Sequence, residues 1–569
     1  MDALLGKAPT ANEISDLYPN ANLPKIATPS PKPANKITVV TNGDLRDSAN
    51  VACWGVQKDF EGRLTKALKD RFNIETVRAH EYKSDVEHGF IGDQREGSDV
   101  FIGIHPEDPV IVLLTAWQYS HHIVPSLVKH KGPILILANF DGTWPGLVGA
   151  LCMGGSLTSL GRSHSRLWSE TFEDEFFYSK LQEWLATGQI EHDTSYLKET
   201  QRNSLLFDTK AGKLGRYLGE WVLQHKEIIG LFDMFCMGMM NGVFPQKALV
   251  DIGMPMESLS QSMLVYEMSL VPQELREECL QWYIDQGMTF HFGTDDINEL
   301  TREQVLEQCA MLIAMARVWK RFGLASVGVQ YQQGLKDVCP ASDFAEGAIG
   351  STTRFPIPDE NGEIIAPGRP IPCVNEVDMG TAVPQTMLYR LLSALDLPAE
   401  TTLHDIRWGS EYEGTFYWDF EISGNVPFEH LKGGIKEAQG YRQPKMYFAK
   451  GGSTLSGQCK KGRFVWARAH YEDSQVHMHV GTGTAYELPQ EEFQRRLDST
   501  TPVWPLMNVT LDGVSRDELM AGHQSNHISV AYVPEDKVAE VTTAFMCMGL
   551  TQGIRMHLAG TPELSTRET

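Results

Sequence analysis

Three short segments, far apart in the sequence, carry the residue types that bind a hard divalent cation. They are residues 344–347 (FAEG), 375–378 (NEVD) and 522–527 (GHQSNH), and they supply a Glu, an Asp and a His among apolar or glycine neighbours. Two carboxylates and one imidazole suit Mn²⁺ or Mg²⁺ better than a thiolate-preferring metal. An ion held this way can grip adjacent sugar oxygens while carboxylates move protons, as the interconversion of an aldose and a ketose requires.

The composition is that of a large globular protein and excludes several partners. With 569 residues, of which 42% are hydrophobic and 22% charged, two to four domains are expected. A formal charge of −23 without a Lys/Arg-rich block argues against nucleic acid or an anionic membrane surface as a partner. No apolar stretch approaches a membrane span, no secretory signal is visible, and the nine cysteines contain no CxxC. We therefore expect buried thiols and a cytoplasmic protein.

The pattern of apolar runs predicts an α/β protein with two doubly wound parallel-sheet domains followed by a β-rich C-terminal domain. Residues 1–36 end in a proline-rich stretch, which predicts an extended N-terminal arm. Residues 37–220 form the first α/β domain in this interpretation, because short apolar runs alternate with amphipathic stretches. The runs read as buried strands are 37–40, 100–104, 110–114 and 134–138, and the helices are 55–71 and 173–185.

A second α/β domain is predicted over residues 221–368. Its clearest helix runs from Thr301 to Arg321 and begins with the capping-box spacing of Thr301 and Gln304. The strand 325–330 follows, which places the 344–347 segment beyond the carboxyl end of a strand, where α/β sheets bind ligands. Residues 369–569 are expected to be β-rich. The strands expected there are 414–422, 463–471, 476–480 and 527–533, with helices at 382–395 and 535–548.

Several segments, in the same order along the chain, resemble the L-fucose isomerase family. Members of this family interconvert aldoses such as L-fucose or D-arabinose with their ketoses, using Mn²⁺. The similar segments are 115–120 (TAWQYS), 139–146 (NFDGTWPG), 237–239 (MGM), 328–332 (GVQYQ), 376–378 (EVD), 504–505 (WP) and 525–527 (SNH). No single segment is specific, and their shared order carries the resemblance.

The resemblance implies a set of functional residues. It assigns Glu346, Asp378 and His527 as ligands of Mn²⁺, with Mg²⁺ and Co²⁺ as alternatives, and makes Glu346 and Asp378 the acid–base pair as well. The positions implied for substrate contact are Trp117, Gln330, Trp504 and Asn526. It further implies a homo-oligomer, with a hexamer as one form, in which Trp117 completes the site of a neighbouring subunit.

Each proposed ligand also has a purely structural explanation. Glu346 is placed to begin a helix, where a carboxylate interacts favourably with the helix dipole. Asp378 is placed to be the N-cap of the helix at 382–395. His527 opens an apolar strand and could be a hydrogen-bonded core residue. Two further histidines, His477 and His479, share one face of a strand as zinc ligands do, but the sequence shows no third ligand at suitable spacing and we interpret them as sheet residues.

Departures from the family pattern concern the sugar more than the reaction. Residues 451–454 lack the family's tyrosine, residues 330–333 lack its basic residue, and His523 is additional. These changes suggest an L-fucose/D-arabinose-like sugar or a hexose modified at C6, whose anionic group Arg46, Arg407 and Lys450 could meet. Two alternatives remain open: a metal-dependent sugar lyase or epimerase on the same scaffold, and a non-catalytic sugar-binding protein.

Overall fold

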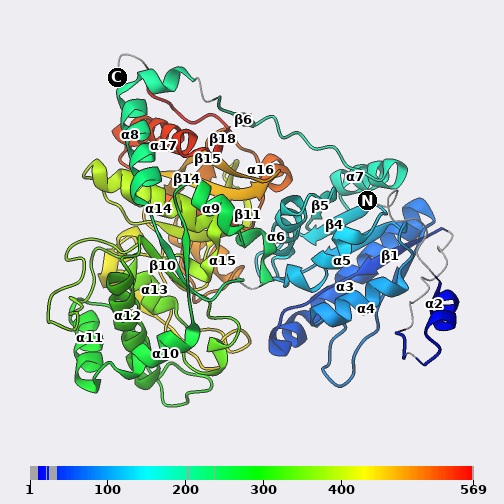
Figure 1. Ribbon diagram of the computed structural model, residues 1–569, viewed down its shortest axis with the longest axis horizontal. Coiled ribbons are helices and arrows are strands. Elements are labelled where there is room, and N and C mark those ends of the chain that lie inside the picture. Colours follow the sequence, from blue (N-terminus) through cyan, green and yellow to red (C-terminus); the bar gives the residue numbers. More distant parts are fainter. Residues whose placement is uncertain (1–9, 21, 25–34, 202–203, 236–237, 567–569) are drawn as a thin grey trace.

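A mixed α/β architecture with two parallel sheets and one larger β-rich sheet characterises the computed structural model (Figure 1). It describes residues 10–20, 22–24, 35–201, 204–235 and 238–566. The first parallel sheet lies to one side in Figure 1, and the second parallel sheet and the β-rich sheet share the other side.

The first sheet has five parallel strands in the order β2-β1-β3-β4-β5. They are β1 (Lys36–Val40), β2 (Glu75–Arg78), β3 (Val110–Leu114), β4 (Ile134–Asn139) and β5 (Ser165–Ser169). Alternate side chains of these strands point to opposite faces. One face packs against α3 (Asp47–Phe72) and α7 (Glu175–Thr187), and the other packs against α4 (Gln94–Gly103), α5 (Val124–Lys129) and α6 (Gly146–Ser159). The sheet is therefore covered by helices on both faces.

Two expectations for the N-terminal part differ from the structure. The run 100–104, expected to be a strand, lies in and just after α4, because Asp93 caps this helix and its apolar side chains pack against the sheet instead of joining it. The expected extended arm contains a helix, α2 (Ala11–Leu17), which a capping box between Thr10 and Glu13 begins. The proline-rich residues 25–34 lie outside the described residues.

The second sheet has three parallel strands in the order β10-β7-β8. They are β7 (Ile229–Phe232), β8 (Met256–Leu259) and β10 (Ser326–Val329). The expected long helix is α12 (Arg302–Phe322), and both hydrogen bonds of its capping box at Thr301 are present. After β10 the chain forms α13 (Asp343–Ile349), which carries Glu346. Helices α9 (Gln246–Asp251), α10 (Gln261–Ser269) and α11 (Gln273–Asp285) lie between β7 and α12 in the chain.

The third sheet has eight strands in the order β14-β17-β11-β12-β16-β15-β18-β6, and β14 also pairs with β15. This extra pairing closes the six antiparallel strands from β14 to β15 into a barrel. The strands are β11 (Thr402–Tyr412), β12 (Thr415–Glu421), β14 (Gly462–Glu472), β15 (Gln475–Tyr486), β16 (Leu506–Leu511), β17 (His527–Tyr532), β18 (Arg555–Ala559) and β6 (Leu197–Glu199). Helices α14 (Met379–Ala394), α15 (Gln490–Asp498), α16 (Arg516–Gly522) and α17 (Val538–Gln552) accompany these strands, and two short strands, β9 (Thr289–Phe290) and β13 (Gln439–Gly440), pair separately.

The chain leaves the first sheet before residue 220, where the domain boundary was expected. Strand β6 lies within the range 37–220, yet it pairs with β18 of the third sheet. Helix α8 (Lys210–His225) packs against α17, and Gly215 permits this approach because a Cβ there would lie 2.0 Å from the carbonyl oxygen of Ala544. Figure 1 shows β6 on the segment that joins the two sides of the molecule.

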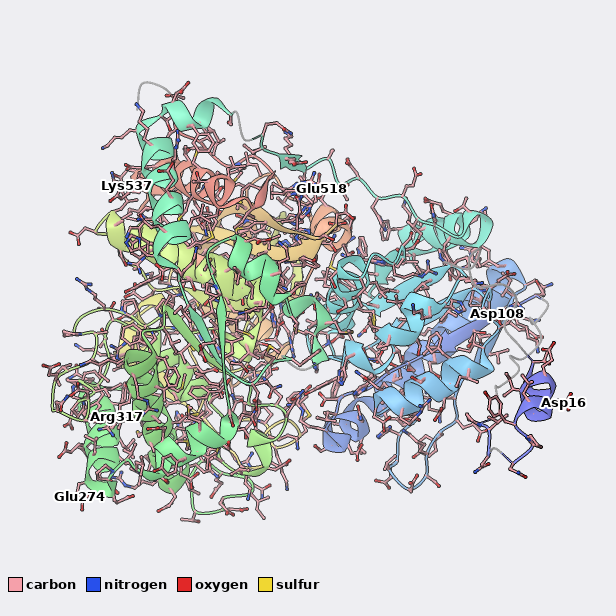
Figure 2. All side chains as sticks on the ribbon, viewed as in Figure 1. Asp16, Asp108, Glu274, Arg317, Glu518 and Lys537 are labelled. Carbon is pink, nitrogen blue, oxygen red and sulfur yellow. The ribbon has the colours of Figure 1, made fainter. Side chains whose placement is uncertain are left out.

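The barrel and the first sheet also meet through α16. Figure 2 labels Glu518 of α16 at the side of the barrel that faces the first sheet. The indole of Trp168 in β5 donates a hydrogen bond of 2.9 Å to Asp517 of the same helix. No helix in the described ranges is both long and apolar enough to cross a membrane. The described cysteines are buried free thiols, as expected.

Candidate active site

A pocket lies where the carboxyl ends of the first two sheets face the barrel. Its cavity volume is about 40 Å³, smaller than that of a typical small-molecule site, so its walls must move apart to admit a sugar. Arg46 and Trp117 follow β1 and β3, and Gln332 follows β10, so the strand ends of both parallel sheets contribute to it. Its lining residues are Arg46, Trp117, Val148, Gln332, Glu376, Asp405, Arg407, Ser423, Tyr447, Phe448 and Trp504.

Aromatic rings form part of the pocket wall. Trp117 and Trp504, both expected to contact substrate, line it together with Tyr447. The indole of Trp504 is held in place by a hydrogen bond of 2.7 Å to Gln443. Such surfaces pack well against the C–H faces of a sugar ring. Trp117 lines the pocket of its own chain, so this pocket already contains the tryptophan expected from a neighbouring subunit.

An acidic group surrounds His527 at the base of the barrel. His527 opens β17 and lies directly opposite Asp405 of β11 in the antiparallel pair. Its Nε2 lies 3.3 Å from an oxygen of Glu376 and 3.4 Å from an oxygen of Asp405. Burial acts to lower the pKa of His527, but its contacts with the surrounding carboxylates, Asp378 first, outweigh burial and raise this pKa to about 10.

Asp378 has a different place from the one expected of a metal ligand. One oxygen accepts a hydrogen bond of 2.8 Å from the N–H of Gly380 and caps α14, and the other accepts from His527 Nδ1 at 2.7 Å and from the buried Arg468. Burial acts to raise the pKa of Asp378, but the Arg468 guanidinium and His527 hold it well below its usual range. The described residues that line the pocket include Glu376 and not Asp378. Asp378 therefore positions the imidazole of His527.

Glu376 is directed toward the pocket by an unusual backbone conformation. Glu376 and Val377 both have positive φ, at 54° and 51°. A β-branched residue rarely adopts this conformation, and such strain is concentrated at functional sites. The hydroxyl of Ser423 donates a hydrogen bond of 2.9 Å to Glu376. Because residues 375–377 form a tight turn with two positive φ values, the sequence motif 375–378 alone could not show which of its two carboxylates reaches the pocket.

Glu346 and Asp343 lie one helical turn apart on α13 and are buried beside this group. Amides of Asn375 and Asn425 donate to one oxygen of Glu346 at 3.2 and 3.1 Å, and its other oxygen makes no hydrogen bond with the described residues. Burial, and then the charge of Asp343, raises the pKa of Glu346 well above its usual value. Burial likewise raises the pKa of Asp343 to about 7, against the hydrogen bond that Gln443 donates.

Asp405 was not among the expected site residues. Burial raises its pKa to about 6 although His527 acts in the opposite direction. Asn526, expected to contact substrate, instead donates a hydrogen bond of 2.6 Å to Asp405 and so orients it. The signal that could have found Asp405 is its spacing from Arg407, because residues two apart on a strand share a face.

The expected Gln330 does not reach the pocket. Its amide donates to the carbonyl of Phe235 at 3.0 Å and its backbone joins β7, whereas Gln332 lines the pocket two residues later. Met237 of the expected Met-Gly segment lies outside the described residues.

The basic residues expected near an anionic group are already engaged. Arg46 forms an ion pair of 2.7 Å with Asp44, and Arg407 lies 3.3 Å from Glu421 and donates to the carbonyl of Gly142 at 2.8 Å. Lys450 is not among the described residues that line the pocket.

A divalent cation fits the chemistry of this acidic group. Carboxylates with raised pKa values crowd around one imidazole, and a buried oxygen of Glu346 lacks a donor among the described residues. A bound cation would offset the burial, and the weaker mutual repulsion, that raise these pKa values. Neither the expected trio of Glu346, Asp378 and His527 nor the combination of Glu346, Glu376 and His527 brings three ligand atoms within 4.8 Å, since the one such group in the described residues lies elsewhere, at His470, Glu472 and His477. Side chains would therefore have to move to enclose an ion here. Among the described residues that face the acidic group, the donors suited to a cation are Glu346, Glu376 and His527.

Comparison with known proteins adds no relative. The chain matches no protein-family model and no curated protein, so its resemblance to the L-fucose isomerase family stays a prediction.

Proposed function

We propose that this protein is a metal-dependent aldose–ketose isomerase that acts on a monosaccharide through a cis-enediol. The observation that supports this most directly is the pair of carboxyl groups, Glu376 and Asp405, that flank the imidazole of His527 inside an aromatic-walled pocket. A 1,2-isomerisation removes a proton from C2 and returns one to C1, which requires proton-transfer groups beside both carbons.

In this proposal Asp405 and Glu376 carry out the proton transfers. A carboxylate at its ordinary pKa is a weak base at neutral pH, and burial brings Asp405 to about 6, close to the working range. Asn526 fixes the orientation of Asp405, and Ser423 fixes that of Glu376. Trp117 and Trp504 would hold the sugar ring and exclude water.

The proposed metal site uses Glu346, Glu376 and His527, with Mn²⁺ as the expected ion and Mg²⁺ or Co²⁺ as alternatives. Such an ion supplies a positive charge that polarises the sugar oxygens and stabilises negative charge on them. His527 must lose its proton to bind the ion, and Asp378 at its Nδ1 keeps the ring in the orientation that presents Nε2. Asp378 is thus a positioning residue in this proposal.

The pocket favours an uncharged sugar of the L-fucose or D-arabinose kind over one with an anionic C6. Arg46 and Arg407 line the pocket, but each is held by a carboxylate. Glu376 and Asp405 add negative charge in the same space. An anionic substrate would therefore meet repulsion without a free guanidinium to offset it. A homo-oligomer, such as a hexamer, is part of the same proposal by resemblance alone.

The test is an isotope experiment with controlled metal content. The protein is treated with chelator, supplied with Mn²⁺ in D₂O, and incubated with aldopentoses, 6-deoxyhexoses and C6-modified hexoses. Ketose that forms only with metal and carries solvent deuterium is the expected result. Glu376→Gln should lose this activity, and Glu360→Gln, at a solvent-exposed carboxylate, serves as the matched control.

Other outcomes identify the alternatives. Cleavage products, or an epimer without ketose, would replace the proposal with a lyase or epimerase that uses a related enediolate. Sugar binding that survives Glu376→Gln and Asp405→Asn, with no conversion of any sugar, would identify a non-catalytic binding protein.

A further inference from the structure

A second group of metal-ligand side chains lies on the outer part of the third sheet, apart from the pocket. His470 of β14 is directly opposite His477 of β15, and His479 is opposite His557 of the neighbouring strand β18. Glu472 follows His470 by two residues on the same strand. Because positions two apart or directly opposite in a sheet share a face, these side chains gather on one side.

The missing third ligand for His477 thus comes from other strands. Sequence spacing showed only His477 and His479, whereas strand pairing adds His470, Glu472 and His557. His477 and His479 both lie in β15, as the interpretation as sheet residues expects.

The distances match those between the ligands of a four-coordinate metal. Ligand atoms of His470, Glu472 and His477 all lie within 4.8 Å of one another. His470 Nε2 is 3.3 Å from Glu472, and His477 Nδ1 is 3.2 Å from His557 Nε2. Ligands about 2.0–2.1 Å from a tetrahedral Zn²⁺ are separated by about 3.3 Å. Three of the side chains are therefore already spaced to hold an ion, whereas His557, which is not in this group, must shift to become the fourth ligand.

The hydrogen bonding of the two buried histidines is incomplete. His470 and His477 are 4% and 5% exposed, and one ring nitrogen of each, His470 Nδ1 and His477 Nε2, makes no hydrogen bond with the described residues. These are not the nitrogens that lie close to Glu472 and His557, so only the spacing of His470 Nε2 and His477 Nδ1 points to an ion.

We propose that His470, Glu472, His477 and His557 bind a late transition-metal ion of the Zn²⁺ class. Three imidazoles and one carboxylate are a donor set for Zn²⁺, in contrast to the carboxylate-rich pocket, which suits Mn²⁺. The side chain of Glu472 is 37% exposed, so an ion can enter from solvent. The ion would join the β14–β15 hairpin to β18, the last strand of the described chain. This site does not depend on the proposed isomerase activity.

The test measures Zn²⁺ binding where the pocket cannot contribute. In Glu346→Gln/Glu376→Gln protein freed of metal, calorimetric titration should show one Zn²⁺ per chain. Adding Glu472→Gln, which keeps the side-chain shape and is partly exposed, should weaken Zn²⁺ binding about 10- to 100-fold, and His470→Asn/His477→Asn should weaken it at least about 100-fold. His291→Asn, at an exposed histidine whose ring hydrogen-bonds Gln439, is the control and should leave binding unchanged.

Two further readouts guard against a folding artefact. The variants should match the parent in circular dichroism without metal, and Co²⁺ in the parent protein should give the intense visible absorption of four-coordinate geometry. The proposal is overturned if the Glu346→Gln/Glu376→Gln protein binds no Zn²⁺, or if adding Glu472→Gln to it leaves its affinity for Zn²⁺ unchanged. Zn²⁺ binding that occurs in the protein with an intact pocket and is absent from the Glu346→Gln/Glu376→Gln protein would also overturn the proposal, because the ion would then lie in the pocket.

Discussion

Exchanging the two carboxylates of the 375–378 segment for their amides should separate catalysis from stability. Glu376→Gln is expected to abolish turnover and leave the fold intact, whereas Asp378→Asn is expected to destabilise the protein. The reason is their surroundings: Glu376 faces the pocket, and Asp378 forms a buried ion pair with Arg468 in which both side chains are 0% exposed.

The magnitudes differ clearly. Asp378→Asn leaves the guanidinium of Arg468 buried without its carboxylate, and breaking a buried pair in this way costs about 3–5 kcal/mol. Glu376→Gln keeps an oxygen to accept the hydrogen bond of Ser423 and removes one of several crowded negative charges, so the unfolding free energy should change by less than about 1.5 kcal/mol. Loss of a proton-transfer group should lower kcat about 10²- to 10⁴-fold.

Denaturant unfolding of each metal-free variant gives the stability change, and ketose formation under saturating Mn²⁺ gives kcat. Ser423→Ala is a useful companion, because it removes a contact of Glu376 without removing the carboxylate and should lower kcat less. A stable, inactive Asp378→Asn protein beside an active Glu376→Gln protein would refute the reasoning and restore Asp378 as the catalytic carboxylate.

Three other changes test the remaining parts of the site. Burial raises the pKa of Asp405 to about 6 in the metal-free protein and a bound cation lowers it, so the acid limb of kcat/KM should lie at or below about pH 6 and fall about tenfold per pH unit; a profile in which Asp405→Asn retains activity with the same acid limb would assign the proton transfer elsewhere. Trp117→Ala should raise KM about tenfold with little change in kcat, through lost ring packing, and an unchanged KM would remove Trp117 from the pocket's function. The pKa of Asp343 rises from 3.8 to about 7 on folding, so ionisation opposes folding. This carboxyl should therefore lower the unfolding free energy of the metal-free protein by about 4 kcal/mol as pH rises from 4 to 8. Asp343→Asn should flatten that pH dependence in denaturant titrations, and an identical slope in both proteins would contradict the raised pKa.

Much of the fold follows from local patterns in the sequence. Continuous apolar runs identified β1, β3 and β4, since a parallel strand buried on both faces needs no alternation. The capping box at Thr301 identified the start of α12. The short strand β6 carries no such pattern, because two of its three residues, Lys198 and Glu199, are exposed and its pairing depends on β18 about 350 residues later.

Only part of the site could be predicted, because the rest depends on contacts between residues that are far apart in the sequence. The segments 375–378 and 522–527 meet at His527, and the segment 344–347 lies beside the first of them through the hydrogen bond from Asn375 to Glu346. Two positive φ values decide that Glu376, and not Asp378, faces the pocket, and the residue types at these positions do not predict such values. The partner Asp405 comes from the neighbouring strand, and cross-strand neighbours become visible only when the register is known.

The pairing of β6 with β18 links protein synthesis to the completion of the third sheet. Arg555 forms a two-point ion pair with Glu199, at 3.1 and 2.9 Å, near the end of the chain. A nascent chain that has emerged only to residue 550 would hold β6 and one edge of β15 without their partner, exposing backbone groups that pair readily with other chains. A chain shortened after Gln552 should therefore be cleaved by protease near β6 faster than the full chain, and equal cleavage rates would show that β18 does not protect this segment. Strand β6 would therefore remain without its partner until β18 has been synthesised.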